Sequence, residues 1–358
     1  MHTPAVLAAT LLLSSASVLG KLYFTARNVV WPVLIAAAHP GGHAYPDSGL
    51  LAKRAEKTAR CANAVGAMKQ KRHQMRKREQ AAQELAKRGN VTTFAIHAEA
   101  PHYDFIKNDT CILYPETTQG PYWYPPSQLL TQDMAQDQAG VPFELDIGVI
   151  DMATCEPLEN ALISLWHCNA TGSYSSYTGR DPNTPFLTLL EQLGITDPSN
   201  YTDFQFLATD TTTWLRGMWP TDASGATSFK TIVPGFYIDR SLHIHAQVHT
   251  NWSVTVNGTI DHSSVVETGQ IFIDEPLSAQ IMAMEPYASH TEIERLKNSG
   301  DGIYAQQAQS GAMPFVDTEP LDGVDYANGV LGYITLVCHF SKSRWLSIFQ
   351  EKIFANLV

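Results

Sequence analysis

Two histidines separated by one residue, His243 and His245, are the first indication of chemistry in this sequence. Residues i and i+2 of a β-strand point to the same face, so both imidazoles can reach one metal ion. The pair alone is a weak signal, because most histidines in such a pattern are surface or core residues. Two tyrosines strengthen it: Tyr237 closely follows a Pro-Gly pair, and Tyr174 follows a Gly-Ser pair.

Two phenols beside two imidazoles favour one kind of metal. A tyrosine hydroxyl has an ordinary pKa of about 10, and a hard trivalent iron ion can hold it deprotonated at neutral pH. Zinc and copper sites more often use cysteine, further histidines or carboxylates. Two phenolates stabilise Fe(III) over Fe(II). A ferric centre cannot easily activate O₂ by donating an electron, so it must instead activate an electron-rich substrate. A catechol suits it, because its two oxygens can chelate the metal.

The chain from about residue 94 must position these side chains, and its pattern is that of a mainly β protein. Short β-rich runs alternate with turn clusters, which predicts an antiparallel β-sandwich rather than βαβ units. The expected strands are residues 143–149, 161–167, 227–232, 244–256 and 265–273. A short helix is expected at 186–193, and residues 275–310 are expected to be helical or irregular.

The N-terminal part carries an opposite charge. The 358 residues have a net charge of −11, but residues 53–88 alone carry +9, which leaves −20 for the remainder. An acidic total argues against nucleic acid as a partner. Residues 51–88 favour a helix with so few apolar side chains that it either needs a partner or remains partly disordered. Pairs of basic residues at 53–54 and 87–88 leave two interpretations open, a solvated basic helix or a removable propeptide.

Export from the cell is expected from the first residues and from the sequons. Residues 1–38 are interpreted as a signal peptide region, and neither of its apolar runs reaches the roughly 18 residues of a membrane span, so no stable membrane association is expected. A secreted, extracellular glycoprotein is predicted, because six N-x-S/T sequons follow this region. They are Asn90, Asn108, Asn169, Asn200, Asn251 and Asn257. Five cysteines then allow disulfides, whose pairing the sequence leaves open.

These patterns divide the chain into four parts. Residues 1–38 form the signal region, 39–89 a basic helical or propeptide-like segment, 90–335 the β-sandwich, and 336–358 an atypical C-terminal tail.

Longer motifs surround the tyrosines and histidines, and their order along the chain is specific. They are Gly120-Pro121-Tyr122-Trp123, Leu165-Trp166-His167-Cys168-Asn169-Ala170-Thr171-Gly172-Ser173-Tyr174-Ser175, Leu215-Arg216-Gly217, Phe229-Lys230-Thr231-Ile232, Pro234-Gly235-Phe236-Tyr237, Arg240, His243-Ile244-His245 and Gly269-Gln270-Ile271-Phe272. Over about residues 105–290 the chain resembles the intradiol ring-cleavage dioxygenases, most of all their secreted fungal branch.

The resemblance implies a non-haem Fe(III) enzyme that uses O₂ to cleave a small aromatic diol between its hydroxylated carbons, giving a muconate-type product. The implied metal ligands are Tyr174, Tyr237, His243 and His245. Tyr237 is implied to be the ligand that the substrate displaces. Arg240 is implied to stabilise anionic ring carbons by its fixed charge. A purely structural alternative for Arg240 is an ion pair with Asp239 or Asp222.

Further residues are expected around the substrate. Tyr122, Tyr177 and Trp219 are interpreted as lining its cavity, although the family pattern leads us to expect glutamine at position 219. The substrate-side glutamine of the bacterial enzymes has no clear equivalent, because neither Gln247 nor Gln270 has the expected spacing.

Two other functions remain open from the sequence. One is a non-catalytic secreted sandwich that binds aromatic compounds or cell-wall polymers. The other is a zinc or copper hydrolase or oxidase that uses only His243 and His245. The sequence indicates neither the natural diol nor the oligomeric state.

Overall fold

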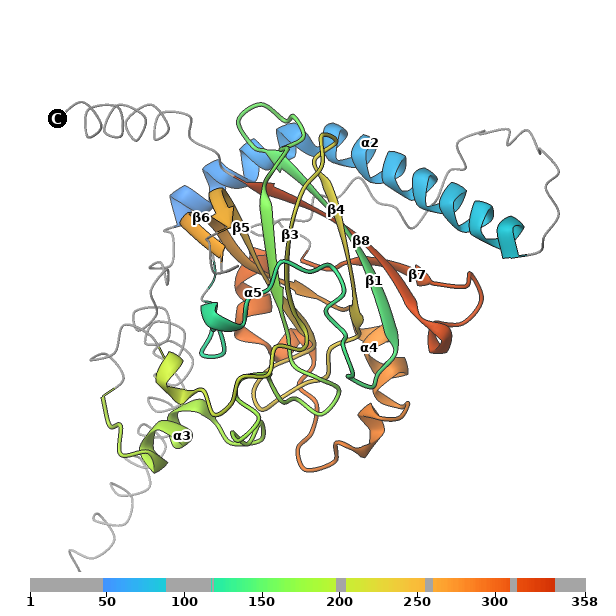
Figure 1. The fold of residues 1–358 in the computed structure, drawn as a ribbon. Coiled ribbons are helices and arrows are strands. Elements are labelled where there is room, and N and C mark those ends of the chain that lie inside the picture. Colours follow the sequence, from blue (N-terminus) through green and yellow to red (C-terminus); the bar gives the residue numbers. More distant parts are fainter. Residues whose placement is uncertain are drawn as a thin grey trace, which may run out of the picture.

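The computed structural model describes residues 48–87, 117, 119–197, 204–254, 260–309 and 314–338. Within them, two four-stranded sheets form a β-sandwich (Figure 1), in the orders β4-β1-β8-β7 and β3-β2-β5-β6. The mainly β class predicted from the sequence is confirmed. The signal region and the sequons at 90, 108, 200 and 257 lie outside the described residues.

The elements have the following bounds. The first sheet contains β4 (Ala226–Ile232), β1 (Pro142–Asp151), β8 (Val330–Cys338) and β7 (Asp317–Pro320). The second contains β3 (Arg216–Pro220), β2 (Leu162–Trp166), β5 (His243–Val254) and β6 (Ile260–Phe272). The helices are α2 (Ser48–Lys87), α3 (Phe186–Gln192), α4 (Glu275–Met282) and α5 (Gly302–Gln309).

The core lies between the two sheets because alternate residues of each strand point inward. In β1, Phe143, Leu145 and Ile147 are buried in the same apolar cluster as Ile163 and Leu165 of β2. A strand places every second side chain on one face, so the apolar residues of both sheets meet across this space. Burial of this cluster fixes the strand registers, because a slip of one residue would turn each apolar set outward.

Strand register places the two histidines at the start of β5, an interior strand of the second sheet. His245 lies opposite Trp166 of β2 on one side and opposite Gln270 of β6 on the other. His243 lies opposite Phe272. Both imidazoles therefore start from a strand that is hydrogen-bonded on both edges, which gives them a rigid support.

Helix α2 covers the outer face of the first sheet (Figure 1), and this supplies the partner that its thin apolar face requires. Its buried residues pack against the ends of β1 and β8: the cluster is Cys61, Val65, Met68, Ile150, Met152 and Val337. Gly148 makes room for the helix, since a Cβ atom there would collide with the guanidinium of Arg72.

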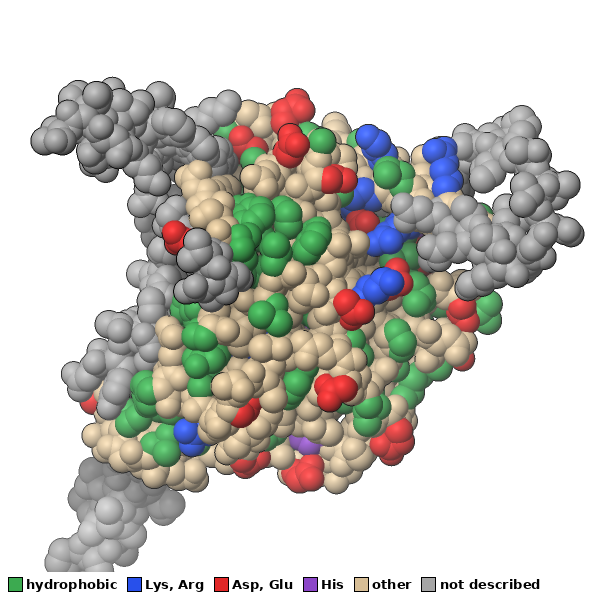
Figure 2. Space-filling view, in the orientation of Figure 1, with side chains coloured by type: hydrophobic (Ala, Val, Ile, Leu, Met, Phe, Trp, Pro, Cys, Tyr) green, Lys and Arg blue, Asp and Glu red, His purple; other side chains and the backbone are tan. Residues whose placement is uncertain are grey.

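Ion pairs explain where the positive charge of α2 is used. Arg72 pairs with the buried Asp146 of β1, and Lys69 Nζ lies 2.7 Å from Oδ2 of Asp317 in β7. Figure 2 shows Lys and Arg side chains gathered where α2 crosses this sheet. The basic segment is therefore bound to acidic residues of the sandwich along part of its length.

A disulfide joins Cys61 of α2 to Cys155, which lies 94 residues further along the chain. Cys168 and Cys338 are buried free thiols, and Cys111 lies outside the described residues. A cleavage at residues 87–88 would thus leave α2 covalently attached to the sandwich.

Removing this disulfide is expected to destabilise the protein strongly. In the Cys61→Ser, Cys155→Ser double variant, the free energy of unfolding should fall by about 4 kcal/mol, because an open chain of this length gains entropy on unfolding. Urea denaturation followed by circular dichroism measures the change. The wild type in reductant is the matched control and should unfold at the same midpoint; a double variant as stable as the oxidised wild type would contradict the prediction.

Three features differ from the expected sandwich. β1 and β8 pair in parallel, whereas the other strand pairs are antiparallel. Strands β3, β7 and β8 were not among the expected strands. Strand β8 continues to Cys338, so residues 336–338, expected to begin the tail, belong to the sandwich. None of the described helices has the length and apolar character needed to cross a bilayer.

Candidate metal and substrate site

Four side chains converge beside β5: Tyr174, Tyr237, His243 and His245, here called the donor cluster. Nε2 of His243 lies 3.2 Å from Nε2 of His245 and 3.3 Å from the Tyr237 hydroxyl. Nε2 of His245 lies 3.1 Å from the Tyr174 hydroxyl. The structure thus brings together all four residues that the sequence singled out, from one strand and two loops.

The donor cluster is almost entirely removed from solvent. His243 and His245 are each 1% exposed, Tyr174 is 2% exposed and Tyr237 is 8% exposed. Burial lowers the pKa of both histidines well below the usual value, so both imidazoles are neutral at neutral pH. Burial also raises the pKa of both tyrosines, and for Tyr237 it outweighs the opposing charge of Arg240. The phenols therefore stay neutral unless a cation binds.

Neighbouring groups orient the two imidazoles. Nδ1 of His243 lies 2.7 Å from the carbonyl oxygen of Ser241. A carbonyl can only accept, so Nδ1 carries the proton and Nε2 presents its lone pair to the cluster. The ring of His245 stacks on Trp166, with centroids 4.9 Å apart and planes 6° from parallel. Gln270 Nε2 is 3.5 Å from Nδ1 of His245, at the outer limit of a hydrogen bond, and does not fix its tautomer.

The loop that carries Tyr174 is fixed by its own sequence. Oδ1 of Asn169 accepts hydrogen bonds from the backbone N–H groups of Thr171 and Ser173, which closes a tight turn. Gly172 follows with φ +88°, and a Cβ atom there would collide with the carbonyl oxygen of Phe236. The glycine therefore lets this loop meet the loop that carries Tyr237.

A second glycine allows the backbone to approach the imidazole of His245. Gly120 has φ +76°, and a Cβ atom at this position would lie 3.1 Å from Cε1 of His245. Tyr122 follows two residues later and stacks on Tyr174, with ring centroids 4.5 Å apart. It also meets Tyr177 edge-on at 5.3 Å. Tyr122 and Tyr177 thus pack beside the donor cluster, where the sequence placed them.

Arg216 ties these segments together from a buried position. It is 1% exposed, its Nε donates to Oγ of Ser175, and its Nη2 donates to the carbonyl oxygens of Ser175 and Tyr122, each at 2.8 Å. Burial lowers its pKa to about 10, so it remains charged at neutral pH. Sequence reasoning gave Arg216 no role of its own.

Trp219 lies away from the donor cluster. On β3 it alternates with Met218, so it points to the face opposite Arg216. It packs against the core between the sheets and lines a pocket beside Arg72 of α2 and Asp146 of β1. The expectation that Trp219 contacts substrate therefore has no support from its position, because strand alternation directs it away from the two tyrosines.

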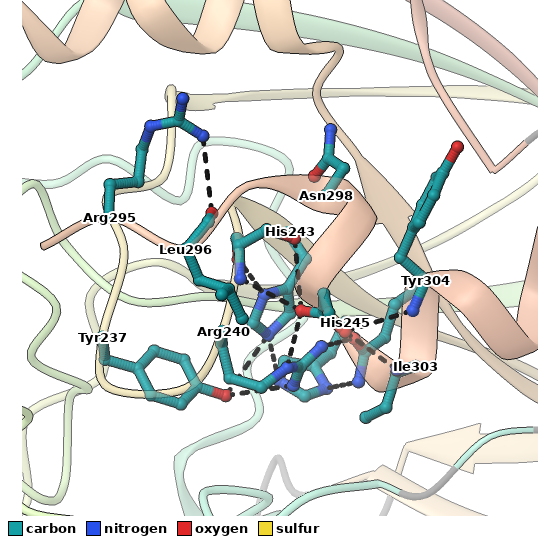
Figure 3. A network of polar contacts seen from close by, with 12 residues as sticks. Tyr237, Arg240, His243, His245, Arg295, Leu296, Asn298, Ile303 and Tyr304 are labelled. Carbon is teal, nitrogen blue, oxygen red and sulfur yellow. Dashed lines mark hydrogen bonds and ion pairs between the residues drawn. The ribbon is translucent and has the colours of Figure 1, made fainter. Parts of the chain in front are cut away.

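Arg240 sits at the open side of the cluster and is held by three groups. Its Nη1 donates to the Tyr237 hydroxyl at 3.3 Å, and its Nη2 donates to Oε1 of Gln270. Its ion-pair partner is Asp301, with Nε 2.9 Å from Oδ2. The alternative partners considered from the sequence, Asp239 and Asp222, are thus wrong. Figure 3 shows Arg240 between Tyr237 and the start of α5.

Gln270 and Asp301 are the residues that sequence reasoning missed. Gln270 was set aside on spacing, but its pairing with His245 across β5 and β6 places it at the cluster. Pairing of the two strands was the signal that would have found it. Asp301 lies 61 residues beyond Arg240 in sequence, and no local pattern connects them.

The donor cluster fits a trivalent metal ion by its chemistry. N and O donors about 2.0–2.1 Å from one ion, and about 90–109° apart, lie about 2.9–3.4 Å from each other. The three neighbouring donor pairs here, at 3.1–3.3 Å, match this spacing. In the described ranges, no three residues among His, Cys, Asp and Glu form a group that could hold a metal. A four-donor site at this place therefore requires the two phenol oxygens, which suit Fe(III) better than zinc.

Comparison with known proteins agrees on the fold. No family model matches the sequence, and no curated protein is similar to it. The structure is similar to an intradiol ring-cleavage dioxygenase from Tetranychus urticae, with a TM-score of 0.50 and 24% identity over 64% of this chain and 95% of that chain. The described core thus has the β-sandwich fold of an intradiol ring-cleavage dioxygenase.

Two bacterial structures are also similar. The dioxygenase domain of a carbohydrate-binding fusion protein from Streptomyces sp. SirexAA-E has a TM-score of 0.37 and 20% identity, over 63% of this chain and 98% of that one. Catechol 1,2-dioxygenase from Pseudomonas arvilla C-1 has a TM-score of 0.35 and 18% identity, over 64% of this chain and 62% of that one.

Proposed function

We propose that this chain is a non-haem Fe(III) intradiol dioxygenase that cleaves catechol-type aromatic diols between the hydroxylated carbons. Both atoms of O₂ enter a muconate-type product. The observation that carries the proposal is the donor cluster, in which two phenol oxygens and two imidazole nitrogens form a buried series with neighbouring atoms 3.1–3.3 Å apart. The fold of the chain supports it.

Tyr174, Tyr237, His243 and His245 would hold the iron. When bound, Fe(III) would supply a Lewis acid that keeps both phenols ionised and activates a chelated diol towards O₂. Tyr237 is the most exposed of the four and has Arg240 at its hydroxyl. Its phenolate oxygen would be placed to accept a proton from the diol.

Arg240 and the neighbouring tyrosines would interact with the substrate ring. The Arg240 guanidinium remains charged and would stabilise negative charge on the substrate ring as O₂ attacks. Tyr122 stacks on Tyr174 and meets Tyr177 edge-on, so both would form an aromatic wall beside the donor cluster. Their burial keeps water from the reacting carbons.

Purified, iron-loaded protein is expected to be burgundy, from charge transfer between phenolate and iron, and to consume O₂ when catechol is added. The test measures visible absorption, iron content and O₂ uptake on one sample across a panel of catechols. Tyr174→Phe should change the colour and depress uptake; a zinc or copper site formed by the histidines alone would be indifferent to it. A colourless, iron-replete preparation would falsify this ligand set.

The non-catalytic alternative predicts binding of aromatic compounds without O₂ uptake. Trp219 lies outside the donor cluster, and all four donors are in place. We therefore favour the enzyme, and O₂ uptake with catechol separates the two.

We also propose that the protein is secreted and extracellular. The Cys61–Cys155 disulfide supports this, because such bonds persist in oxidising compartments. Of the two described sequons, Asn251 is exposed, whereas the side chain of Asn169 is engaged in the Tyr174 loop. Glycosidase digestion followed by peptide mass spectrometry should find glycan on Asn251 and none on Asn169.

A further inference from the structure

Asp301 is a buried carboxylate in a segment to which the sequence assigned no function. It is 0% exposed and immediately precedes α5. Its Oδ1 accepts hydrogen bonds from the backbone N–H groups of Ile303 at 2.9 Å and Tyr304 at 3.1 Å, so it caps the helix. Figure 3 shows these two residues on the side of Arg240 that faces away from Tyr237.

The second oxygen of Asp301 has a different set of partners. Oδ2 accepts from Nε of Arg240 at 2.9 Å, from the backbone N–H of Ser241 at 3.0 Å and from Oγ of Ser241 at 3.2 Å. A residue needed only to cap α5 would not require these three donors. The carboxylate therefore divides its oxygens between the helix and the loop that leads from Tyr237 to His243.

This contact fixes how the guanidinium faces the donor cluster. A guanidinium is planar, so holding Nε at one edge sets the directions of Nη1 and Nη2. Nη1 then points to the Tyr237 hydroxyl and Nη2 to Gln270. Helix α5 is itself anchored to the same strand, because Nε2 of Gln307 donates to the carbonyl oxygen of Gln270 at 3.1 Å.

We propose that Asp301 is the positioning residue of the site: acting through Arg240, it sets the direction from which the guanidinium meets Tyr237 and the bound diol. This rests on the proposed function, because it assigns a catalytic role to Arg240. Asp301 forms no hydrogen bond with the donor cluster. Its contacts reach the site through Arg240 and through Ser241, whose carbonyl oxygen accepts from Nδ1 of His243.

Asp301→Asn separates the two tasks of the carboxylate. Asparagine caps helices as well as aspartate, so its amide oxygen can keep the bonds to Ile303 and Tyr304. Its amide nitrogen then faces Arg240 and Ser241, which are also donors. The three hydrogen bonds that Oδ2 of Asp301 accepts from these two residues, here called the clamp, are therefore lost. We expect kcat to fall about 10- to 100-fold, as when a supporting group of a metal site is removed, with iron content unchanged and a smaller change in KM.

A spectroscopic measurement without substrate accompanies the kinetics. A hydrogen bond from Arg240 stabilises the Tyr237 phenolate electrons, so weakening it should move the charge-transfer band to longer wavelength. In an Arg240→Leu background, Asp301→Asn should move the band no further, because both changes remove the same contact. Equal shifts in both backgrounds would show that Asp301 does not act through Arg240.

Asp274→Asn is the matched control. Asp274 caps α4 by accepting a hydrogen bond from the N–H of Leu277 at 3.0 Å, away from the donor cluster. It should keep the wild-type kcat and band position. Wild-type kinetics and absorption in Asp301→Asn, or loss of its iron, would overturn the positioning role.

Failure of the proposed function is recognised separately, in the wild type, by absence of iron, colour and O₂ uptake. The clamp is then read in the metal-free protein by NMR of the arginine Nε–H groups. Slow solvent exchange at Arg240, made fast by Asp301→Asn but not by Asp274→Asn, supports the clamp; equal exchange rates in all three proteins overturn it.

Discussion

His245→Ala is expected to abolish both iron binding and O₂ uptake. Nε2 of His245 is one of the two inner atoms of the donor cluster, within 3.2 Å of both the His243 Nε2 atom and the Tyr174 hydroxyl. Removing even a supporting group of a metal ligand costs about 10- to 100-fold, so losing this ligand should lower iron affinity and O₂ uptake by at least about 100-fold. Iron titration followed at the charge-transfer band, with an oxygen electrode for catechol turnover, measures both.

His249→Ala is the control for the loss of stability that follows when a buried histidine side chain of this strand is truncated. His249 lies on the same strand and is also buried, with 0% of its surface exposed, but it is not part of the donor cluster. Its alanine variant should lose stability without losing iron. If His245→Ala keeps stoichiometric iron and its colour, the assignment of His245 as a ligand is wrong.

His249 also shows a limit of reading burial from a sequence. Its parity matches that of His243 and His245, and the structure buries it completely. The register with β2 stays regular through His249, and only the register with β6 shifts between Val248 and His249. Alternation therefore predicts which residues share a face of a strand, but not whether other segments cover that face.

Local patterns predicted the features that depend on a few neighbouring residues. The β-sandwich follows from runs of alternating residues, and the convergence of His243 and His245 follows from their spacing on a strand. Asn169, whose side chain closes the Tyr174 loop, stands within that loop itself. In each case the interactions that decide the structure join residues close in sequence.

Contacts between distant segments explain what the sequence did not reveal. Gln270 reaches the cluster through pairing of β5 with β6, and Asp301 reaches Arg240 from a helix that follows the sheet. The parallel pairing of β1 with β8 joins strands almost 190 residues apart, on the order of a whole domain. Such partners depend on topology, and spacing alone could not distinguish Asp301 from Asp239 or Asp222.

The same limit applies to α2. Its composition predicted a helix that needs a partner, but not which surface would cover it. The structure places it on β1 and β8, where Arg72 finds Asp146 and Cys61 finds Cys155. The basic charge of the segment and part of the acidic charge of the sandwich therefore compensate one another, which the net charge of −11 conceals.

Arg240→Leu is expected to lower kcat/KM for catechol by about 100- to 1000-fold, the usual cost of losing one preorganised group that stabilises charge in the transition state. The variant should still bind iron, because Arg240 contacts the Tyr237 oxygen but is not itself a donor to the metal. Arg240→Lys should recover only part of the loss, since a lysine keeps the charge but cannot hold Asp301, Tyr237 and Gln270 with one planar group. Steady-state O₂ uptake with iron quantified in each sample measures the series.

Arg295→Leu is the matched control for Arg240→Leu, because it also removes an arginine from an ion pair. Arg295 forms a two-bond ion pair with Glu275, at 2.9 and 3.0 Å, and reaches no residue of the donor cluster (Figure 3). Its variant should keep the wild-type kcat/KM. If Arg240→Leu retains that value too, the guanidinium serves only the fold, and the charge that develops on the ring must be stabilised by other groups. If instead kcat falls while KM holds, the loss lies in the transition state, as expected for a group placed against the reacting ring rather than for one that merely binds the diol.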